Sequence, residues 1–240
     1  MDIFLQQLIN GLVLGSIYAL VALGYTMVYG ILGLINFAHG EVVMIGAMVA
    51  LAVIQAFSGL MLPGPVIVLL GLLVAIPACM LLGYGIERVA YRPLRHAPRL
   101  APLITAIGVS IVLQNVAMIL WGRQYISFPP LLPTDAYTVG GAHITALQIF
   151  IFLLAAVIMA GLIFLVQKTR LGRAMRATAQ NPEVAGLMGV NVNSVISVTF
   201  IIGSALAAVA GVMVSAYYGL AHYYMGFLLG LKAFSAAVLG

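Results

Sequence analysis

The N-terminal stretch of the chain is the feature that most limits how it can fold. From Ile3 to Gly40 no side chain carries a formal charge, and almost every residue is apolar or small. Taken as one α-helix, residues 3–36 would be roughly 50 Å long at about 1.5 Å per residue. That length exceeds one crossing of a hydrocarbon core about 30 Å thick and is too short for two. We therefore expect one membrane crossing followed by a partial re-entry.

Three polar side chains arrive together at the end of this stretch. Asn36, His39 and Glu41 lie close in sequence, with Gly33 and Gly40 among them. Ionisable groups inside membrane proteins line interiors or solute paths, because contact with lipid is costly. A helix can stop and restart in the membrane only where protein or water satisfies its free backbone groups. The pattern predicts a broken helix beside a solute path, gated by Asn36, His39, Gly40 and Glu41. An ordinary turn at the membrane surface is the alternative.

Composition extends the membrane prediction to the whole chain. Hydrophobic residues make up 64% of the sequence and charged residues 6%. No water-soluble domain could cover such a sequence with polar surface. We expect an all-α polytopic membrane protein with about six to seven transmembrane helices, some of them discontinuous. Cys79 is the single cysteine, which excludes an internal disulfide.

The positive charges predict how these helices are oriented. The net charge is +5, and eight of the ten basic residues fall within residues 87–99 and 168–176. Basic residues gather in the cytoplasmic segments of membrane proteins, so we expect both segments to be cytoplasmic loops. We also expect contact with lipid and no nucleic-acid partner. Two crossings separate the basic segments and three precede them, which places the N-terminus outside. The spans after the first are expected at 41–57, 66–86, 102–121 and 143–166.

Two adjacent amides, Gln114 and Asn115, lie in the second half of the expected span 102–121. Amides within a membrane span either bond to neighbouring helices or contact a polar solute. Both residues are therefore candidates for the solute path, and a structural role between helices stays open for each.

A very short helix is expected between the second basic segment and the next apolar stretch. Asn181 suits the N-cap, Glu183 favours the positive end of the helix dipole, and Gly189 suits a left-handed stop. Leu187 and its neighbours Val184 and Met188 fall on one face. A helix this short does not persist alone in water. It must lie against the membrane surface, the rest of this protein or a separate protein.

The two halves of the chain show a faint internal similarity. GSIYAL at 15–20, followed by YG at 29–30, has a counterpart in GSALAA at 203–208, followed by YG at 218–219. Each stretch leads into a break that holds a histidine, His39 in the first and His222 in the second. Interrupted helices at matching places suggest inverted repeats around a midplane solute site. We expect a first repeat at about 6–166, a connecting loop at 167–194, and an incomplete second repeat at 195–240.

Several motifs resemble one family of transport proteins. They are NGLVLGSIYAL at 10–20, GYTMVYGI at 24–31, INFAHGE at 35–41, IERVAYRPLR at 86–95 and LGLKAFSAAVLG at 229–240. Together these motifs resemble the LivH-type permease subunits of high-affinity branched-chain amino acid ABC importers. The resemblance covers essentially the whole chain. It implies one transmembrane permease domain over residues 1–240 and a family length beyond Gly240, so the chain is expected to be a shortened version.

The resemblance also implies partners in the bacterial inner membrane. These are a second, LivM-like permease subunit, two ATP-binding subunits, and a periplasmic amino acid-binding protein that delivers leucine, isoleucine or valine. Residues 169–173 and 181–191 resemble the family's cytoplasmic loop that docks on the ATPase. The residues that this likeness assigns to coupling are Arg170, Gly172, Arg173, Asn181, Glu183, Leu187 and Gly189.

Other functions are weighed against this one on the residues themselves. No G-x-x-x-x-G-K-[ST] phosphate loop occurs, so ATP and Mg²⁺ are expected on partner subunits, and the chain is expected to be no enzyme and to hold no cofactor or metal. An intramembrane hydrolase is disfavoured because the pair His39 and Glu41 lacks the spacing of H-E-x-x-H. A passive small-solute channel, or an importer of urea, short amides or other amino acids, stays the more serious alternative.

Overall fold

A computed structural model describes residues 2–59, 63–95, 97–98, 100–130, 136–139 and 141–239. Within these residues the chain is mainly helical, and six helices are long and apolar enough to cross a membrane. This confirms the all-α polytopic prediction. The six spanning helices are α1 (Asp2–Leu32), α2 (His39–Phe57), α3 (Gly64–Ile86), α4 (Leu100–Trp121), α5 (Ala146–Lys168) and α8 (Val192–Tyr218), and the shorter ones are α6 (Arg170–Gln180), α7 (Pro182–Leu187) and α9 (Met225–Leu239).

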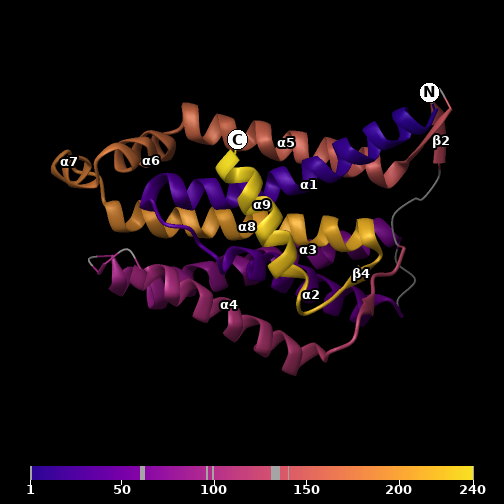
Figure 1. Ribbon diagram of the computed structural model, residues 1–240, viewed down its shortest axis with the longest axis horizontal. Helices are drawn as coiled ribbons and strands as arrows, with labels where there is room; N and C mark the ends of the chain where they lie inside the picture. Colours follow the sequence, from indigo (N-terminus) through magenta and orange to yellow (C-terminus); the bar gives the residue numbers. More distant parts are fainter. Residues whose placement is uncertain are drawn as a thin grey trace.

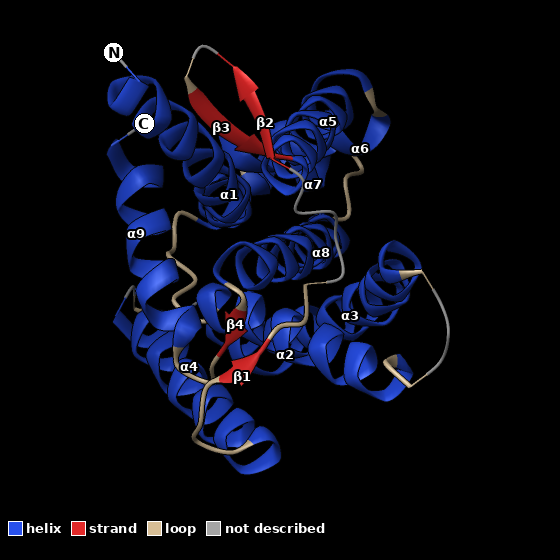
Figure 2. Cartoon of the chain, turned by 90° about the vertical axis from the view of Figure 1, so that its right-hand side faces the viewer, coloured by secondary structure: helices blue, strands red, loops and turns tan. Residues whose placement is uncertain are grey.

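Helices α2 and α8 form the centre of the bundle. Figure 1 shows α1, α3, α5 and α8 running lengthwise, with α9 crossing them obliquely. Viewed along the bundle, α8 lies between α1 and α5 on one side and α2 and α3 on the other (Figure 2). A Cβ added at Gly46 of α2 would lie 2.6 Å from the Cα of Ala208 in α8, and one at Gly211 would collide with the carbonyl of Val43. Small residues therefore let the two backbones approach closely.

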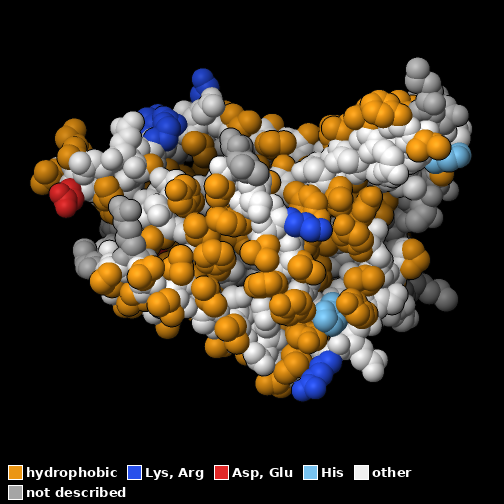
Figure 3. Space-filling view, in the orientation of Figure 1, with side chains coloured by type: hydrophobic (Ala, Val, Ile, Leu, Met, Phe, Trp, Pro, Cys, Tyr) orange, Lys and Arg blue, Asp and Glu red, His pale blue; other side chains and the backbone are white. Residues whose placement is uncertain are grey.

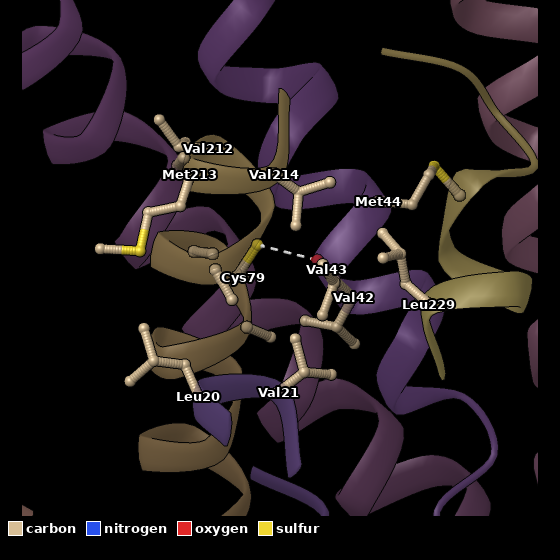
Figure 4. Packing of buried hydrophobic residues seen from close by; sticks show 14 of the residues in the cluster. Leu20, Val21, Val42, Val43, Met44, Cys79, Val212, Met213, Val214 and Leu229 are labelled. Atoms are coloured by element: carbon tan, nitrogen blue, oxygen red, sulfur yellow. Dashed lines mark hydrogen bonds between the residues drawn. The ribbon is translucent and has the colours of Figure 1, made fainter. Parts of the chain in front are cut away.

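Apolar side chains from five helices meet around this central pair. Figure 4 shows Leu20 of α1, Val42 of α2, Cys79 of α3, Met213 of α8 and Leu229 of α9 converging on one region. The Cys79 thiol is buried and lies 3.6 Å from the carbonyl oxygen of Val42, to which it donates a weak hydrogen bond. The core therefore fixes α2 against α3, α8 and α9.

One end of the bundle carries short strands, and we call it the hairpin end. Strand β1 (Ile126–Ser127) pairs antiparallel with β4 (Leu220–Ala221), and β2 (Ala136–Val139) pairs antiparallel with β3 (Ala142–Thr145). The fifth span was expected from residue 143 but begins at Ala146, because His143 to Thr145 belong to β3. A capping box then starts α5, with the Thr145 hydroxyl accepting from the Gln148 amide at 3.2 Å.

The opposite end carries the two basic segments, and we call it the basic end. Both basic segments were expected as loops, and both expectations are wrong. The chain after α3 continues as a π-helix, Glu87–Tyr91, and a 3₁₀ turn, Arg92–Leu94. Residues 170–176 belong to α6, whose N-cap Thr169 accepts from the Gly172 amide at 3.0 Å. His96 and Arg99 of the first segment lie outside the described residues.

Two helix breaks lie at opposite ends of the bundle. Gly33, with φ of +62°, follows α1, and Gly219, with φ of +69°, ends α8. After the first break His39 packs against Gly24 of α1. Gly24 lies eight residues before the end of α1, a distance of about 12 Å along the helix. The chain has therefore re-entered the bundle before α2 begins. The interrupted helix is therefore present, and its position beside a solute path stays a prediction.

The second break mirrors the first in direction. Helices α1 and α8 run oppositely (Figure 1), and each is followed by a short connection and a second helix, α2 or α9. The first turns of α2 and α9 meet where a Cβ at Gly40 would collide with the carbonyl of Gly226, and one at Gly226 with the carbonyl of Gly40. The repeat boundaries 6–166 and 195–240 stay a prediction.

Candidate functional site

Glu41 is held by two side chains of α4 inside the bundle. It is 1% exposed, and its Oε1 accepts hydrogen bonds from the Ser110 hydroxyl at 3.0 Å and the Gln114 amide at 2.7 Å. Its Oε2 has no hydrogen-bond partner among the described residues and lies 2.8 Å from where a Cβ of Gly226 would be. Of the two roles left open for Gln114, the bond to a neighbouring helix is thus present, and contact with a solute stays a prediction. Ser110 was not singled out from the sequence, although its i, i+4 spacing to Gln114 puts both on one face.

Asn36 fixes the backbone of the first break. It is 4% exposed, and its Oδ1 accepts from the Ala38 amide at 3.2 Å and from the Tyr91 hydroxyl at 3.0 Å. The first bond closes an Asx turn just before α2. The second joins the break to the π-helix at the basic end. Asn36 therefore holds the first helix break against the π-helix through these two hydrogen bonds.

His39 fills a space that a glycine of α1 leaves open. Its ring is 2% exposed and lies edge-on to the Tyr25 ring, with centroids 4.8 Å apart. A Cβ at Gly24 would collide with this ring. The Nε2 atom has no hydrogen-bond partner among the described residues. Within those residues no group of three His, Cys, Asp or Glu side chains could hold a metal ion.

A cavity of about 200 Å³ lies directly beside the Glu41 contacts, and we call it the α4–α9 cavity. Ser110 and Gln114 form its polar corner, and Gly226 and Gly230 form the wall on α9. The remaining lining is largely apolar or aromatic, from Tyr25, Phe37, Ile107, Ile111, Tyr224, Phe227 and Leu231. A small apolar solute with a polar end would match this lining. The buried Glu41 carboxylate lies next to this polar corner, where it accepts the hydrogen bonds of Ser110 and Gln114.

Two other residues expected on the solute path lie apart from Glu41. Asn115 is exposed, and its amide donates to the Ile111 carbonyl of its own helix at 2.8 Å. His222 lies near the hairpin end, where its Nε2 is 3.1 Å from the Arg123 carbonyl and its Nδ1 accepts from the Tyr224 amide at 3.3 Å. Its ring stacks on Tyr125 at 4.2 Å. The structure therefore gathers Asn36, His39, Gly40, Glu41 and Gln114 but neither Asn115 nor His222.

The predicted short helix is present as α7, with both of its ends marked as expected. The Asn181 side chain accepts from the amides of Glu183 at 3.0 Å and Val184 at 3.1 Å, and Gly189 has φ of +83°. The helix lies at the basic end next to α6 (Figure 1). Its apolar side chains point outward, since Leu187 is 87% and Met188 81% exposed.

Helix α6 joins α7 to the bundle through a close turn. A Cβ at Gly172 would collide with the carbonyl oxygens of Leu165 and Val166 at the end of α5, so only glycine lets α6 turn there without a backbone shift. Arg170 and Arg173 are exposed on the same helix, while Met175 and Thr178 are buried. The basic face of α6 therefore points away from the bundle.

A buried ion pair connects the segment after α3 to the start of α8. Glu87 is fully buried and pairs with Arg95, which also bonds the Asn193 side chain. The other Glu87 oxygen accepts from the Ser197 hydroxyl at 2.7 Å. This pair was not expected from the sequence, where Glu87 read as part of an exposed basic loop.

The sequence of the chain is similar to those of known transport proteins. Residues 7–240 match the family model described as branched-chain amino acid transport system, permease component. The high-affinity branched-chain amino acid transport system permease protein BraD of Pseudomonas aeruginosa is 48% identical over 99% of this chain and 79% of its own length. The corresponding permease protein LivH of Escherichia coli K12 is 46% identical over the same shares, and that of Salmonella typhimurium 47%. No solved structure matches the chain.

Proposed function

We propose, from the premise that the chain belongs to the permease-component family of branched-chain amino acid transport systems, that it carries leucine, isoleucine or valine across the bacterial inner membrane. In this proposal it is the membrane-spanning subunit of an ATP-driven importer. The family likeness extends over nearly the whole chain at 46–48% identity. The α4–α9 cavity, apolar with one polar corner, supports a small aliphatic solute.

In this proposal, partner subunits supply the energy for transport. No phosphate-loop sequence occurs in the chain, so two ATP-binding subunits would hold ATP and Mg²⁺. A second permease subunit would complete the path, and a periplasmic binding protein would deliver the amino acid. The basic residues at one end support a cytoplasmic position for α6 and α7. The hairpin end and the N-terminus would then face the periplasm.

The single observation that carries the proposal is the exposed apolar surface of α7. A helix of six residues is too short to persist unaided, yet this one has a side-chain cap, a left-handed stop and two outward apolar residues, Leu187 and Met188. Such a surface favours a protein partner, because large exposed apolar groups at the tip of a projection mark interaction sites. The exposed Arg170 and Arg173 on α6 would contact the same partner.

A continuous series of contacts leads from this surface to the gate. Helix α8 follows α7 directly, and its residues Asn193 and Ser197 bond the Glu87–Arg95 pair. Glu87 opens the π-helix that ends at Tyr91, whose hydroxyl bonds Asn36 at the first break. A displacement of α7 would thus reach the segment that carries His39, Gly40 and Glu41. Single-turn π-helices occur often at functional sites.

The test is uptake into proteoliposomes that contain the assembled importer. Deletion of residues 181–189, or charge reversal at both Arg170 and Arg173, should abolish ATP-driven leucine uptake while the subunit still inserts. Arg123→Glu, at the hairpin end, is the matched control and should leave coupling intact. Normal ATP-driven uptake with the α7 deletion would overturn the proposed coupling.

Substrate class needs a separate measurement. Competition of labelled leucine uptake by unlabelled leucine, valine and urea separates a branched-chain amino acid importer from an importer of urea or short amides. Uptake that continues at the same rate after removal of the ATP-binding subunits would instead identify a passive channel.

A further inference from the structure

Lys232 is a basic residue in the middle of an otherwise apolar helix. It is the eighth of the fifteen residues of α9, and its Nζ lies 5.9 Å from the centroid of the Tyr18 ring. Tyr18 is near the midpoint of α1, which crosses the whole bundle. The ammonium group therefore lies near the middle of the membrane depth. Figure 3 shows a basic side chain surrounded by hydrophobic ones in the region of α9.

A cation at this depth needs an anion or water nearby, because lipid alone makes it very unfavourable. The ion pair found among the described residues joins Glu87 and Arg95 and does not involve Lys232. Glu41 is turned toward Ser110 and Gln114 of α4. The Tyr18 ring offers a cation–π contact, which compensates for part of the lost hydration. The described part of this chain thus supplies an aromatic contact and no carboxylate.

The Lys232 side chain is exposed on the outer face of α9, and it lines the edge of a cavity of about 260 Å³, which we call the tyrosine cavity. Four tyrosines, Tyr18, Tyr125, Tyr218 and Tyr224, line it together with His222 and Lys232. Apolar side chains of α8 and α9 complete the wall. Tyr125 and His222 stack on each other beside β1 and β4, so the cavity extends from the hairpin end down to Lys232.

The lining of the tyrosine cavity fits one chemical class of ligand. Aromatic rings and apolar walls suit an aliphatic side chain, and a lysine ammonium in a partly apolar site binds a carboxylate strongly. Tyr224, just before α9, lines both this cavity and the α4–α9 cavity. Along α9 the two cavities take residues from opposite faces, Leu228 and Lys232 on one side and Gly226 and Gly230 on the other. A solute bound at Lys232 would therefore lie across α9 from the gate formed by α2 and α9.

We propose that Lys232 binds the carboxylate of the transported amino acid at the inner end of the tyrosine cavity, across α9 from the gate. This inference rests on the proposed transport of branched-chain amino acids and adds a solute-binding residue to it.

The first test uses the unmodified complex and amine labelling read by mass spectrometry. The chain has two lysines, Lys168 and Lys232, and the exposed Lys168 at the basic end is the internal reference. Leucine and 4-methylpentanoate, which keeps the carboxylate, should lower the ratio of labelling at Lys232 to that at Lys168 in a saturable way. 3-Methylbutylamine, which lacks the carboxylate, should not. Equal protection by all three compounds, or none, would overturn the proposal.

The second test compares variants on the same helix. With saturating loaded binding protein, Lys232→Gln should lower leucine uptake about tenfold, the loss expected for one charge-assisted hydrogen bond, while the binding protein still stimulates ATP hydrolysis. Lys232→Arg should keep most of the uptake. Ser235→Ala is the matched control, because the Ser235 hydroxyl bonds only the Leu231 carbonyl of its own helix at 2.9 Å.

Two results would count against the solute site. Undiminished uptake by Lys232→Gln shows that the carboxylate is not bound there. Loss of subunit assembly in Lys232→Gln, restored in Lys232→Arg, shows instead that Lys232 pairs with an acidic group of the second permease. Failure of the proposed function gives a different result, because the unmodified complex would then take up no leucine. The labelling test with 4-methylpentanoate would still show whether a carboxylate binds at Lys232.

Discussion

At both helix breaks a long helix is followed by a glycine with positive φ, a short connection and a second helix. The two breaks differ in what their side chains contact. The first break, between α1 and α2, buries Asn36, His39 and Glu41, and it bonds Glu41 to α4 and Asn36 to the segment after α3. The second, between α8 and α9, holds His222, which is partly exposed and bonds nearby loop atoms. The first break therefore connects three parts of the bundle. The second closes the hairpin end and presents a cavity.

This difference assigns unequal roles to two segments that look alike in the sequence. Both contain a histidine and both precede a helix whose first turn contains a glycine. Buried polar groups are mostly hydrogen-bonded, and Asn36 and Glu41 find their partners on distant helical segments. His222 bonds only loop atoms among the described residues. We infer that the first break carries the moving gate, and that the second supplies the surface against which it closes.

The largest effect is expected where the first turns of α2 and α9 meet. Gly226→Val would force a branched side chain against the Gly40 carbonyl and Glu41 Oε2, and overpacking of this kind destabilises by about 3 kcal/mol or more when the backbone cannot yield. Thermal unfolding of the purified complex should show the loss, together with no uptake. Gly30→Val is the matched control, since a Cβ at Gly30 meets nothing within 4 Å. Equal stability of the two variants would contradict the close contact of α2 with α9.

A smaller effect is expected from changing the charge at the first break alone. Glu41→Gln keeps an acceptor for Ser110 and Gln114 but loses the charge, so the complex should assemble while leucine uptake falls about tenfold. Gln114→Leu should lower uptake in the same direction, because it removes the 2.7 Å bond to Glu41. Asn115→Leu should not, because that amide bonds its own helix. Unchanged uptake and expression in Glu41→Gln would remove the proposed role of the carboxylate.

The smallest effect is expected at the second break. His222→Phe keeps the stacking on Tyr125 and loses the bonds to the Arg123 carbonyl and the Tyr224 amide. The free energy of unfolding should fall by about 1 kcal/mol, while ATP hydrolysis by the complex continues. A loss as large as that of Gly226→Val would show that the second break is as tightly coupled as the first, and the comparison between them would fail.

Local signals in the sequence were sufficient for some of these features. Asn181 and Gly189 mark the ends of α7 through interactions with their immediate neighbours, so the helix could be predicted from those residues alone. The break before α2 could be predicted because polar and glycine residues interrupt an apolar stretch. The bond from Gln114 to another helix was one of two readings that the amide pair left open.

Other features depend on contacts between distant residues and carry no local signal. Glu87 and Arg95 read as an exposed basic loop, because nothing nearby shows that Ser197 and Asn193 of α8 cover them. Strands β1 and β4 are two residues each and exist only through their mutual pairing, which joins segments far apart in the sequence. Lys232 offered a usable signal, a charge inside an apolar stretch, which is the same signal that singled out Glu41.

The account depends most on the claim that the buried first break opens only when α7 is driven by the ATP-binding subunits. Cys79 is the single native cysteine and is buried, so Cys79→Ser with Ser110→Cys places one reactive thiol at the polar corner beside Glu41. A membrane-impermeant thiol reagent should label this position during ATP turnover with the binding protein present, and not in its absence or after deletion of residues 181–189. Labelling at the same rate without nucleotide, or in the α7 deletion, would contradict the account.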